Sequence, residues 1–298
     1  MSNNAKNEGN PFNLRTAATH GHVDLVELLL DEPNAEYDGV DDRGRTPLIL
    51  AASGGHPEVV ELLLEYARPT PSHPAPRVKV NHKAEDGSTA LRAALAADSA
   101  EVAEVLLREP DIDVEVEVTY AEEWTPLGAA SLAGYLKVTK AIAKKLAAKK
   151  PNALCTKHRG ESVQGTPLYL ASDGGHTKVV KLLLRDEYLP KAEEEKKKYI
   201  NDTSMGGRTA LLAAATNGHA DVVDLLLRKN ANTAAQSSDG MTPLKAAIIG
   251  GHTSVVKLLF AQDKRNSEGR GVNVYSTGSN RTTKGEEVLS DVLLKDDA

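Results

Sequence analysis

Cysteine and aromatic residues are scarce in this sequence. Its 298 residues include one cysteine and one tryptophan, and aromatic residues make up 4% of the chain. The single cysteine, Cys155, has no partner for an internal disulfide, so we expect a reducing compartment, the cytosol or the nucleus. Leucine, valine and alanine must then fill the core, because aromatic rings are too few to do so.

A net positive charge and long apolar runs are missing too. The formal net charge is −6 at pH 7, which creates no positive field for nucleic acid. No apolar run approaches the roughly 18 residues that a membrane-spanning helix needs, and the first residues, MSNNAKNEGNPF, contain no apolar signal region. We therefore expect neither nucleic acid nor a membrane as a partner.

Local signatures of the common catalytic chemistries are absent as well. The chain has no GxxxxGK[ST] phosphate loop, no GxSxG nucleophile elbow, no HExxH helix and no CxxC pair. On this basis we expect no cofactor and no metal ion.

What the chain has in abundance is repetition. Residues 46–64 read TPLILAASGGHPEVVELLL, and later copies begin at Thr89, Thr125, Thr166, Thr209 and Thr242, with a degenerate first copy over residues 12–30. Thr46 is suited to cap a helix whose first residue is Pro47, and Gly55 is suited to end that helix in a left-handed conformation. The motif therefore predicts one helix followed by a tight turn.

A second helix follows the turn in each copy. Val59, Val60, Leu63 and Leu64 recur at one-, four- and five-residue offsets, which places them on one face for burial. Five histidines share the position just after the turn glycine, where we expect them to secure the turn between the two helices: His22, His56, His176, His219 and His252. Each unit is thus helix, turn, helix, and neighbouring units must stack to bury their apolar faces.

This pattern, TPLxxAAxxGHxxVVxLLL, resembles the ankyrin repeat. The resemblance covers residues 12–262 and implies an all-α solenoid of about seven helix-turn-helix units with short β-hairpin fingers. Surplus residues near 67–79, 147–164 and 185–199 predict insertions that loop off the stack. Residues 1–11 form a flexible N-terminus in this interpretation, and residues 263–298 a degenerate repeat or capping tail.

Three segments outside the motif carry predictions of their own. The proline-rich residues 68–77 are interpreted as a stiff spacer rather than as a ligand for a proline-reading module, because no apolar anchors accompany the prolines. The run KAEEEKKK at residues 191–198 pairs acids with lysines four residues later, which predicts a solvent-facing helical extension. Apolar residues at helical spacing in residues 286–295 favour a capping helix over a detachable partner-binding helix.

Recognition in ankyrin repeat proteins uses the finger tips and the exposed positions of the first helices, and the resemblance implies the same surface here. Trp124, the only tryptophan, occupies such a position, and tryptophan and arginine are enriched among binding hot spots. The competing interpretation is that Trp124 folds back on the adjacent finger. The candidate partner-binding residues are Arg45, Tyr120, Glu122, Glu123, Trp124, Leu132, Tyr169, Asp173, Arg208 and Met241.

We therefore expect a monomeric, non-enzymatic scaffold that binds another protein. The alternative is an enzyme with an active site in the groove around the fifth repeat, in which His158, Arg159, Tyr169 and Asp173 supply acid, base and anion-binding groups. A third interpretation is a structural subunit that associates with itself or with a larger complex.

Overall fold

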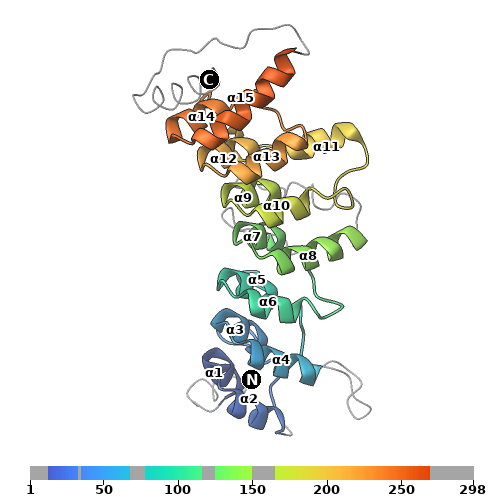
Figure 1. The fold of residues 1–298 in the computed structure, drawn as a ribbon. Helices are drawn as coiled ribbons and strands as arrows, with labels where there is room; N and C mark the ends of the chain where they lie inside the picture. Colours follow the sequence, from blue (N-terminus) through green and yellow to red (C-terminus); the bar gives the residue numbers. More distant parts are fainter. Residues whose placement is uncertain (1–12, 33–34, 68–77, 116–124, 150–164, 269–298) are drawn as a thin grey trace. The chain divides into compact units, whose positions relative to one another are not determined.

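The computed structural model describes residues 13–32, 35–67, 78–115, 125–149 and 165–268. These residues form seven helix pairs (Figure 1). The first helices of the pairs are α1 (Leu14–His20), α3 (Pro47–Gly54), α5 (Ala90–Ala96), α7 (Pro126–Leu132), α9 (Pro167–Asp173), α12 (Ala210–Thr216) and α14 (Pro243–Gly250). The second helices are α2 (Val23–Leu30), α4 (Pro57–Ala67), α6 (Ala100–Leu106), α8 (Leu136–Lys149), α10 (Thr177–Leu183), α13 (Ala220–Arg228) and α15 (Thr253–Glu268).

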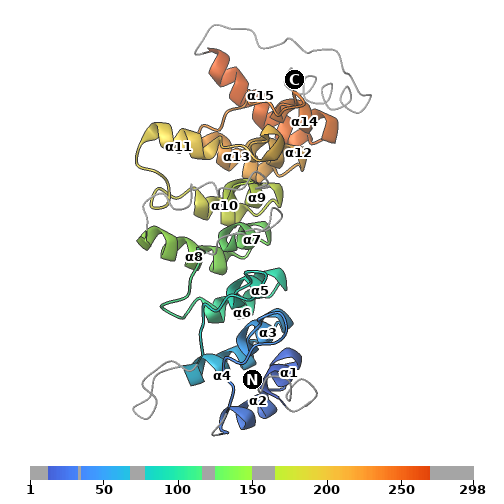
Figure 2. The same cartoon turned by 180° about the vertical axis from the view of Figure 1, so that it is seen from behind.

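The chain divides into two compact units. Unit 1 comprises Met1–Ala130 and Lys140–Lys145, and unit 2 comprises Ser131–Thr139 and Leu146–Ala298, so the division runs through α7 and α8. Within unit 1, α1, α3 and α5 are neighbours, as are α2, α4 and α6; within unit 2, α9, α12 and α14 are neighbours, and α13 packs against both α10 and α15 (Figure 2). Each unit is therefore a stack of helix pairs.

Every first helix begins as its sequence predicts. The threonine that opens each motif copy lies before the helix, and its Oγ1 accepts a hydrogen bond from the amide three residues later, at 3.4 Å for Thr46 and 3.2 Å for Thr209. This bond satisfies one of the amide groups that a helix leaves unpaired at its start. In the degenerate first copy, Asn13 Oδ1 accepts the corresponding hydrogen bond from the Thr16 amide at 2.8 Å.

The turns and the buried faces also match the motif. Gly55 has a φ of 71° and closes α3 through bonds from its amide to the Ala51 and Ala52 carbonyls. Val59, Val60, Leu63 and Leu64 are at most 3% exposed. The expected helix-turn-helix unit is confirmed.

The described fingers between the pairs are tight turns without the β-strands of the expected hairpins. The described residues contain no β-strand, and their one isolated bridge joins Thr203 to Thr209. In each of the four described fingers, at residues 41–45, 84–88, 204–208 and 237–241, two backbone hydrogen bonds close the turn. In the last, the Ser237 amide donates to the Met241 carbonyl at 3.0 Å and the Gly240 amide to the Ser237 carbonyl at 2.8 Å. Two bonds hold a turn but are too few for a strand ladder.

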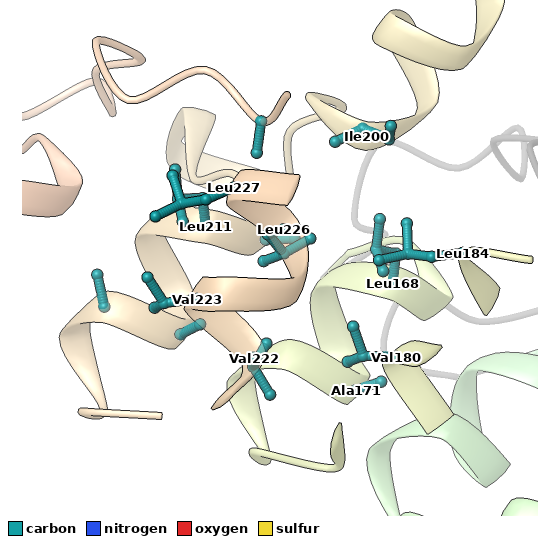
Figure 3. Close-up of a cluster of buried hydrophobic side chains, with 14 of the residues drawn as sticks. Leu168, Ala171, Val180, Leu184, Ile200, Leu211, Val222, Val223, Leu226 and Leu227 are labelled. Carbon is teal, nitrogen blue, oxygen red and sulfur yellow. The ribbon is translucent and has the colours of Figure 1, made fainter. Parts of the chain in front are cut away.

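The third insertion contains a separate helix, α11 (Glu193–Ile200), where the charge run predicted an extension of a helix. Its ion pairs have a different register, however: Glu193 pairs with Lys196 at 2.7 Å and Glu194 with Lys197 at 3.2 Å, three residues apart instead of four. The insertion does not simply loop off, because Leu189, Tyr199 and Ile200 are at most 6% exposed. Figure 3 shows Ile200 within the buried cluster of unit 2, together with leucines and valines of α9, α10, α12 and α13.

Several predicted segments lie outside the described residues. They are the flexible N-terminus at residues 1–11, the proline-rich spacer at residues 68–77, the greater part of the second insertion at residues 150–164, and the capping helix at residues 286–295. They stay predictions.

Candidate partner-binding surface

Neighbouring fingers are joined by hydrogen bonds within each unit. In unit 1 the Glu85 amide donates to the Arg43 carbonyl at 3.0 Å, and His82 Nε2 lies 2.9 Å from the Gly44 carbonyl. In unit 2 the Ser238 amide donates to the Gly206 carbonyl at 2.8 Å. These bonds fix the finger tips of adjacent repeats relative to each other.

Asparagine side chains add further bonds between neighbouring repeats. Asn81 donates to the Asp111 carbonyl at 2.7 Å and accepts from the Asp113 amide at 2.8 Å. Asn201 accepts from the Asn232 amide at 2.7 Å. The helix motif did not predict these residues, although the sequence carries a signal for them: Asn81 and Asn201 each precede their motif threonine by eight residues.

Arg45 is half-buried and already paired. Its guanidinium contacts the Asp41 carboxylate at 2.7 and 2.8 Å, and the Arg45 and Arg43 amides donate to the same carboxylate. Partial burial acts to raise the pKa of Asp41, but these hydrogen bonds outweigh it and hold the pKa below its ordinary value. Arg45 therefore stabilises its own finger.

A hollow of about 430 Å³ lies beside this finger in unit 1. Its lining comes from α1, from the finger and from the end of α3, and it includes Arg15, His20, Asp42 and Ser53. Arg15 Nη1 donates to the Val40 carbonyl at 2.7 Å, which holds the guanidinium against the finger. The hollow is open, and its lining carries both signs of charge.

In unit 2, the predicted residues Arg208 and Met241 occupy corresponding positions at the bases of two fingers. Arg208 is half-buried, and its Nη2 donates to Thr216 Oγ1 at 3.2 Å. The Met241 amide bonds to its own turn, donating to Ser237 Oγ at 3.2 Å. Leu132 and Ile249, at the ends of α7 and α14, are 36% and 49% exposed. The Arg208 guanidinium thus reaches from the base of its finger to the end of α12, the helix position that corresponds to those of Leu132 and Ile249.

The fifth repeat does not assemble the alternative active site among the described residues. Tyr169 is 8% exposed, which leaves little of it for a partner or a substrate. Asp173 accepts a bond from Asn217 Nδ2 at 3.0 Å. His158 and Arg159 lie outside the described residues, so their distance from either group is a matter of prediction.

Four of the partner-binding candidates also lie outside the described residues. They are Tyr120, Glu122, Glu123 and Trp124. Their role at the finger before α7 stays a prediction.

The motif histidines bond to the preceding repeat rather than to their own turn. Nε2 of His56, His176, His219 and His252 lies 2.7 to 3.0 Å from a backbone carbonyl at the end of the previous first helix: Thr19, Leu132, Asp173 and Thr216, respectively. A carbonyl can only accept, so Nε2 carries the proton. His22, in the first repeat, instead stacks on His20 with the ring centres 5.8 Å apart.

The described ranges contain no cluster of three or more histidine, cysteine, aspartate or glutamate side chains that is arranged to hold a metal ion. No described helix combines the length and the hydropathy that crossing a membrane requires.

Comparison with known proteins identifies the repeat. A family model for ankyrin repeats, spanning three copies, matches residues 3–74 and 187–269, and a model for the single ankyrin repeat matches residues 165–189. The chain is similar to the crystal structure of the ankyrin repeat domain of Bcl-3, a member of the IkappaB family, with 21% identity and a TM-score of 0.58 over 86% of this chain and 100% of that one.

Two further ankyrin repeat domains show the same fold. The human ASB11 domain is 24% identical, with a TM-score of 0.59 over 84% of this chain and 96% of that one. A domain from Acinetobacter baumannii is 26% identical, with a TM-score of 0.54 over 73% of this chain and 97% of that one.

Proposed function

Because the chain belongs to the ankyrin repeat family, we propose that it is a non-enzymatic scaffold that binds another protein through its finger tips and the exposed ends of its first helices. Ankyrin repeats generally serve as protein interaction modules. The single cysteine supports a cytosolic or nuclear location for this activity.

The observation that carries the proposal is the bonding between adjacent fingers. The backbone bonds from Glu85 to Arg43 and from Ser238 to Gly206 hold neighbouring tips in place before any partner arrives. A surface that is already ordered loses little conformational entropy on association, so more of the contact energy appears as affinity.

Within unit 2, Arg208 is the described residue best suited to anchor a partner. The residue is half-buried, and its guanidinium donates to Thr216 Oγ1 and interacts with the Asp239 carboxylate. A guanidinium has five N–H groups, so it can also reach outward to a partner. Trp124 is the second anchor we propose, on the basis of its position in the motif.

Quantitative affinity capture from native lysate tests the proposal. Arg208→Ala and Trp124→Ala should each deplete one specific protein from the capture, and titration of that purified protein should show binding weakened by about 1 to 4 kcal/mol. Arg228→Ala is the matched control, because Arg228 is an exposed arginine on the second helix α13. Equal capture by all four proteins would contradict the proposal.

Metabolite profiling of cells with and without the chain tests the enzyme alternative. The scaffold proposal predicts no substrate–product pair that depends on the chain. A reproducible pair that disappears with Asp173→Asn or His158→Ala would overturn it, since proton-transfer groups contribute about 10² to 10⁴ in rate.

A further inference from the structure

We call the contact between the first helices of two successive repeats a seam, and the seam between α3 and α5 in unit 1 lacks the histidine bond found at four others. The third repeat has Ser99 and the fourth has the larger Tyr135 where the second, fifth, sixth and seventh have histidine. The carbonyl that would accept the bond belongs to Ser53, at the end of α3. A serine Oγ lies one bond beyond the β-carbon, whereas histidine Nε2 lies three bonds beyond it, so serine does not span the gap that histidine spans at the other seams. The Ser99 side chain makes no capping hydrogen bond at the start of α6.

The imidazole does more than donate one bond at the other seams. Its ring covers the turn glycine of the preceding repeat, and a β-carbon at Gly21, Gly134, Gly175 or Gly218 would come within 2.6 Å of that ring. A β-carbon at Gly55 would have the Ser99 side chain as its nearest neighbour, at 3.8 Å. The seam between α3 and α5 is therefore short of both a hydrogen bond and the packing of a ring.

Hydrogen bonds join the two repeats at the opposite end of the same seam, where the fingers lie. The fingers that precede α3 and α5 are joined by the Glu85 amide to Arg43 carbonyl bond and by His82 to the Gly44 carbonyl. The eight residues of α3 separate this bonded end from the turn end by about 12 Å. On the outer side, Arg108 and Glu61 form an ion pair at 3.0 Å, but both side chains are more than half exposed, which makes the pair weak.

We infer that the seam between α3 and α5 is a hinge: it opens at the turn end, with the bonded fingers as its pivot. Opening swings α3, together with the hollow beside it, relative to α5 and α6. The first two repeats then move as one body, because His56 joins them through the Thr19 carbonyl at 3.0 Å. This motion adjusts the curvature of the unit 1 surface, whatever partner that surface takes.

Amide hydrogen exchange on the free protein, resolved by NMR, tests the hinge without any partner. The reporters are backbone amides at equivalent positions of two pairs of turns. The first pair flanks the proposed hinge: the His56 and Ser99 amides, which donate to the Ala51 and Ala94 carbonyls. The second pair flanks the seam between the fifth and sixth repeats: the His176 and His219 amides, which donate to the Ala171 and Ala214 carbonyls. After correction for intrinsic rates, the first pair should exchange faster than the second, because the seam between His56 and Ser99 lacks the histidine bond, whereas His219 supplies it at the seam between His176 and His219.

Ser99→His supplies the missing side chain. The net contribution of one hydrogen bond changes the opening equilibrium about fivefold. In this variant we therefore expect about fivefold slower exchange at the His56 amide and at the Ala97 amide, which donates to the Ala93 carbonyl in the turn before residue 99. Ser99→Ala is the control and should leave both rates within a factor of two. Conversely, His219→Ala removes an existing bond and should speed exchange at the His176 amide by about fivefold.

Two results would overturn the hinge. One is a wild-type His56 amide that exchanges as slowly as that of His176. The other is a folded Ser99→His variant whose exchange near α3 and α5 equals that of the wild type. If Ser99→His does not fold, the wild-type comparison and His219→Ala still decide the question.

Discussion

Asn217 holds the end of the neighbouring helix α9 through two atoms of one residue, Asp173. Its Nδ2 lies 2.9 Å from the Asp173 carbonyl oxygen and 3.0 Å from Oδ1 of the carboxylate. The same carbonyl also accepts from His219 Nε2 at 3.0 Å. Asp173 is therefore part of the seam between the fifth and sixth repeats.

This arrangement predicts unequal effects of two substitutions. Asn217→Ala removes both bonds and should lower the free energy of unfolding by about 0.5 to 1.5 kcal/mol. Asp173→Asn keeps the backbone carbonyl and an acceptor oxygen at the side chain, so its effect should stay within about 0.5 kcal/mol. Urea unfolding followed by circular dichroism measures both. A larger loss for Asp173→Asn than for Asn217→Ala would contradict the assignment.

A second prediction separates backbone strain from steric conflict. Gly218 and Gly240 both have a φ of 75°, but a β-carbon at Gly218 would lie 2.5 Å from the His252 ring, whereas nothing lies within 4 Å of one at Gly240. Gly240→Ala should cost about 1 kcal/mol through strain alone, and Gly218→Ala clearly more. Equal shifts in the urea midpoint would show that His252 moves aside without cost.

The finger around Asp41 predicts a defined pH dependence. Since hydrogen bonds hold the pKa of Asp41 below its ordinary value of 3.8, its ionised form stabilises the folded state. That contribution is fully present above pH 3.8 and is lost as the pH falls through the lower, folded-state pKa. Asp41→Asn should therefore reduce the melting temperature at pH 7, and the difference from the wild type should vanish towards pH 2.

The neighbouring Asp42 provides the control for this experiment. It is exposed on the same turn, and within the described ranges its carboxylate makes no hydrogen bond. Asp42→Asn should leave the melting temperature close to that of the wild type at both pH values. A pH-independent effect of Asp41→Asn would rule out the carboxylate as its cause.

The helix in the third insertion predicts a sharp contrast between its two faces. Ile200 is 5% exposed within the unit 2 core, so Ile200→Ala should cost about 2 to 5 kcal/mol by leaving a cavity. Lys197→Ala, on the solvent-facing side, should change the free energy of unfolding by less than about 0.5 kcal/mol. Chemical denaturation of both variants measures this, and a small effect of Ile200→Ala would mean that α11 is a detachable insertion.

Local rules account for the parts of the fold that the sequence predicted. The cap at Thr46, the left-handed Gly55 and the buried face of α4 each depend on residues within one motif, so the order of residue types was enough to predict them. The histidine bonds were not predicted correctly, since they join residues 36 to 46 positions apart and depend on how repeats stack.

The candidate site was harder to predict for the same reason. A position in the motif indicates which side of a repeat a residue lies on, but not its neighbours. Arg45 fitted the pattern of an exposed anchor, yet Asp41 occupies its guanidinium. Tyr169 fitted the groove pattern, yet it is buried at the start of α9. The burial of Tyr199 and Ile200 was hidden by the charged run before them.

The seam histidines make one position of the repeat unusually tolerant. Each of them bonds to a backbone oxygen, and the residues that supply it are as unlike as Thr19, Leu132 and Asp173. The histidine bond itself thus does not depend on the side chain of the residue that accepts it, while that side chain stays at least partly exposed. Randomising this position in several repeats would give a library of binding surfaces on one unchanged framework.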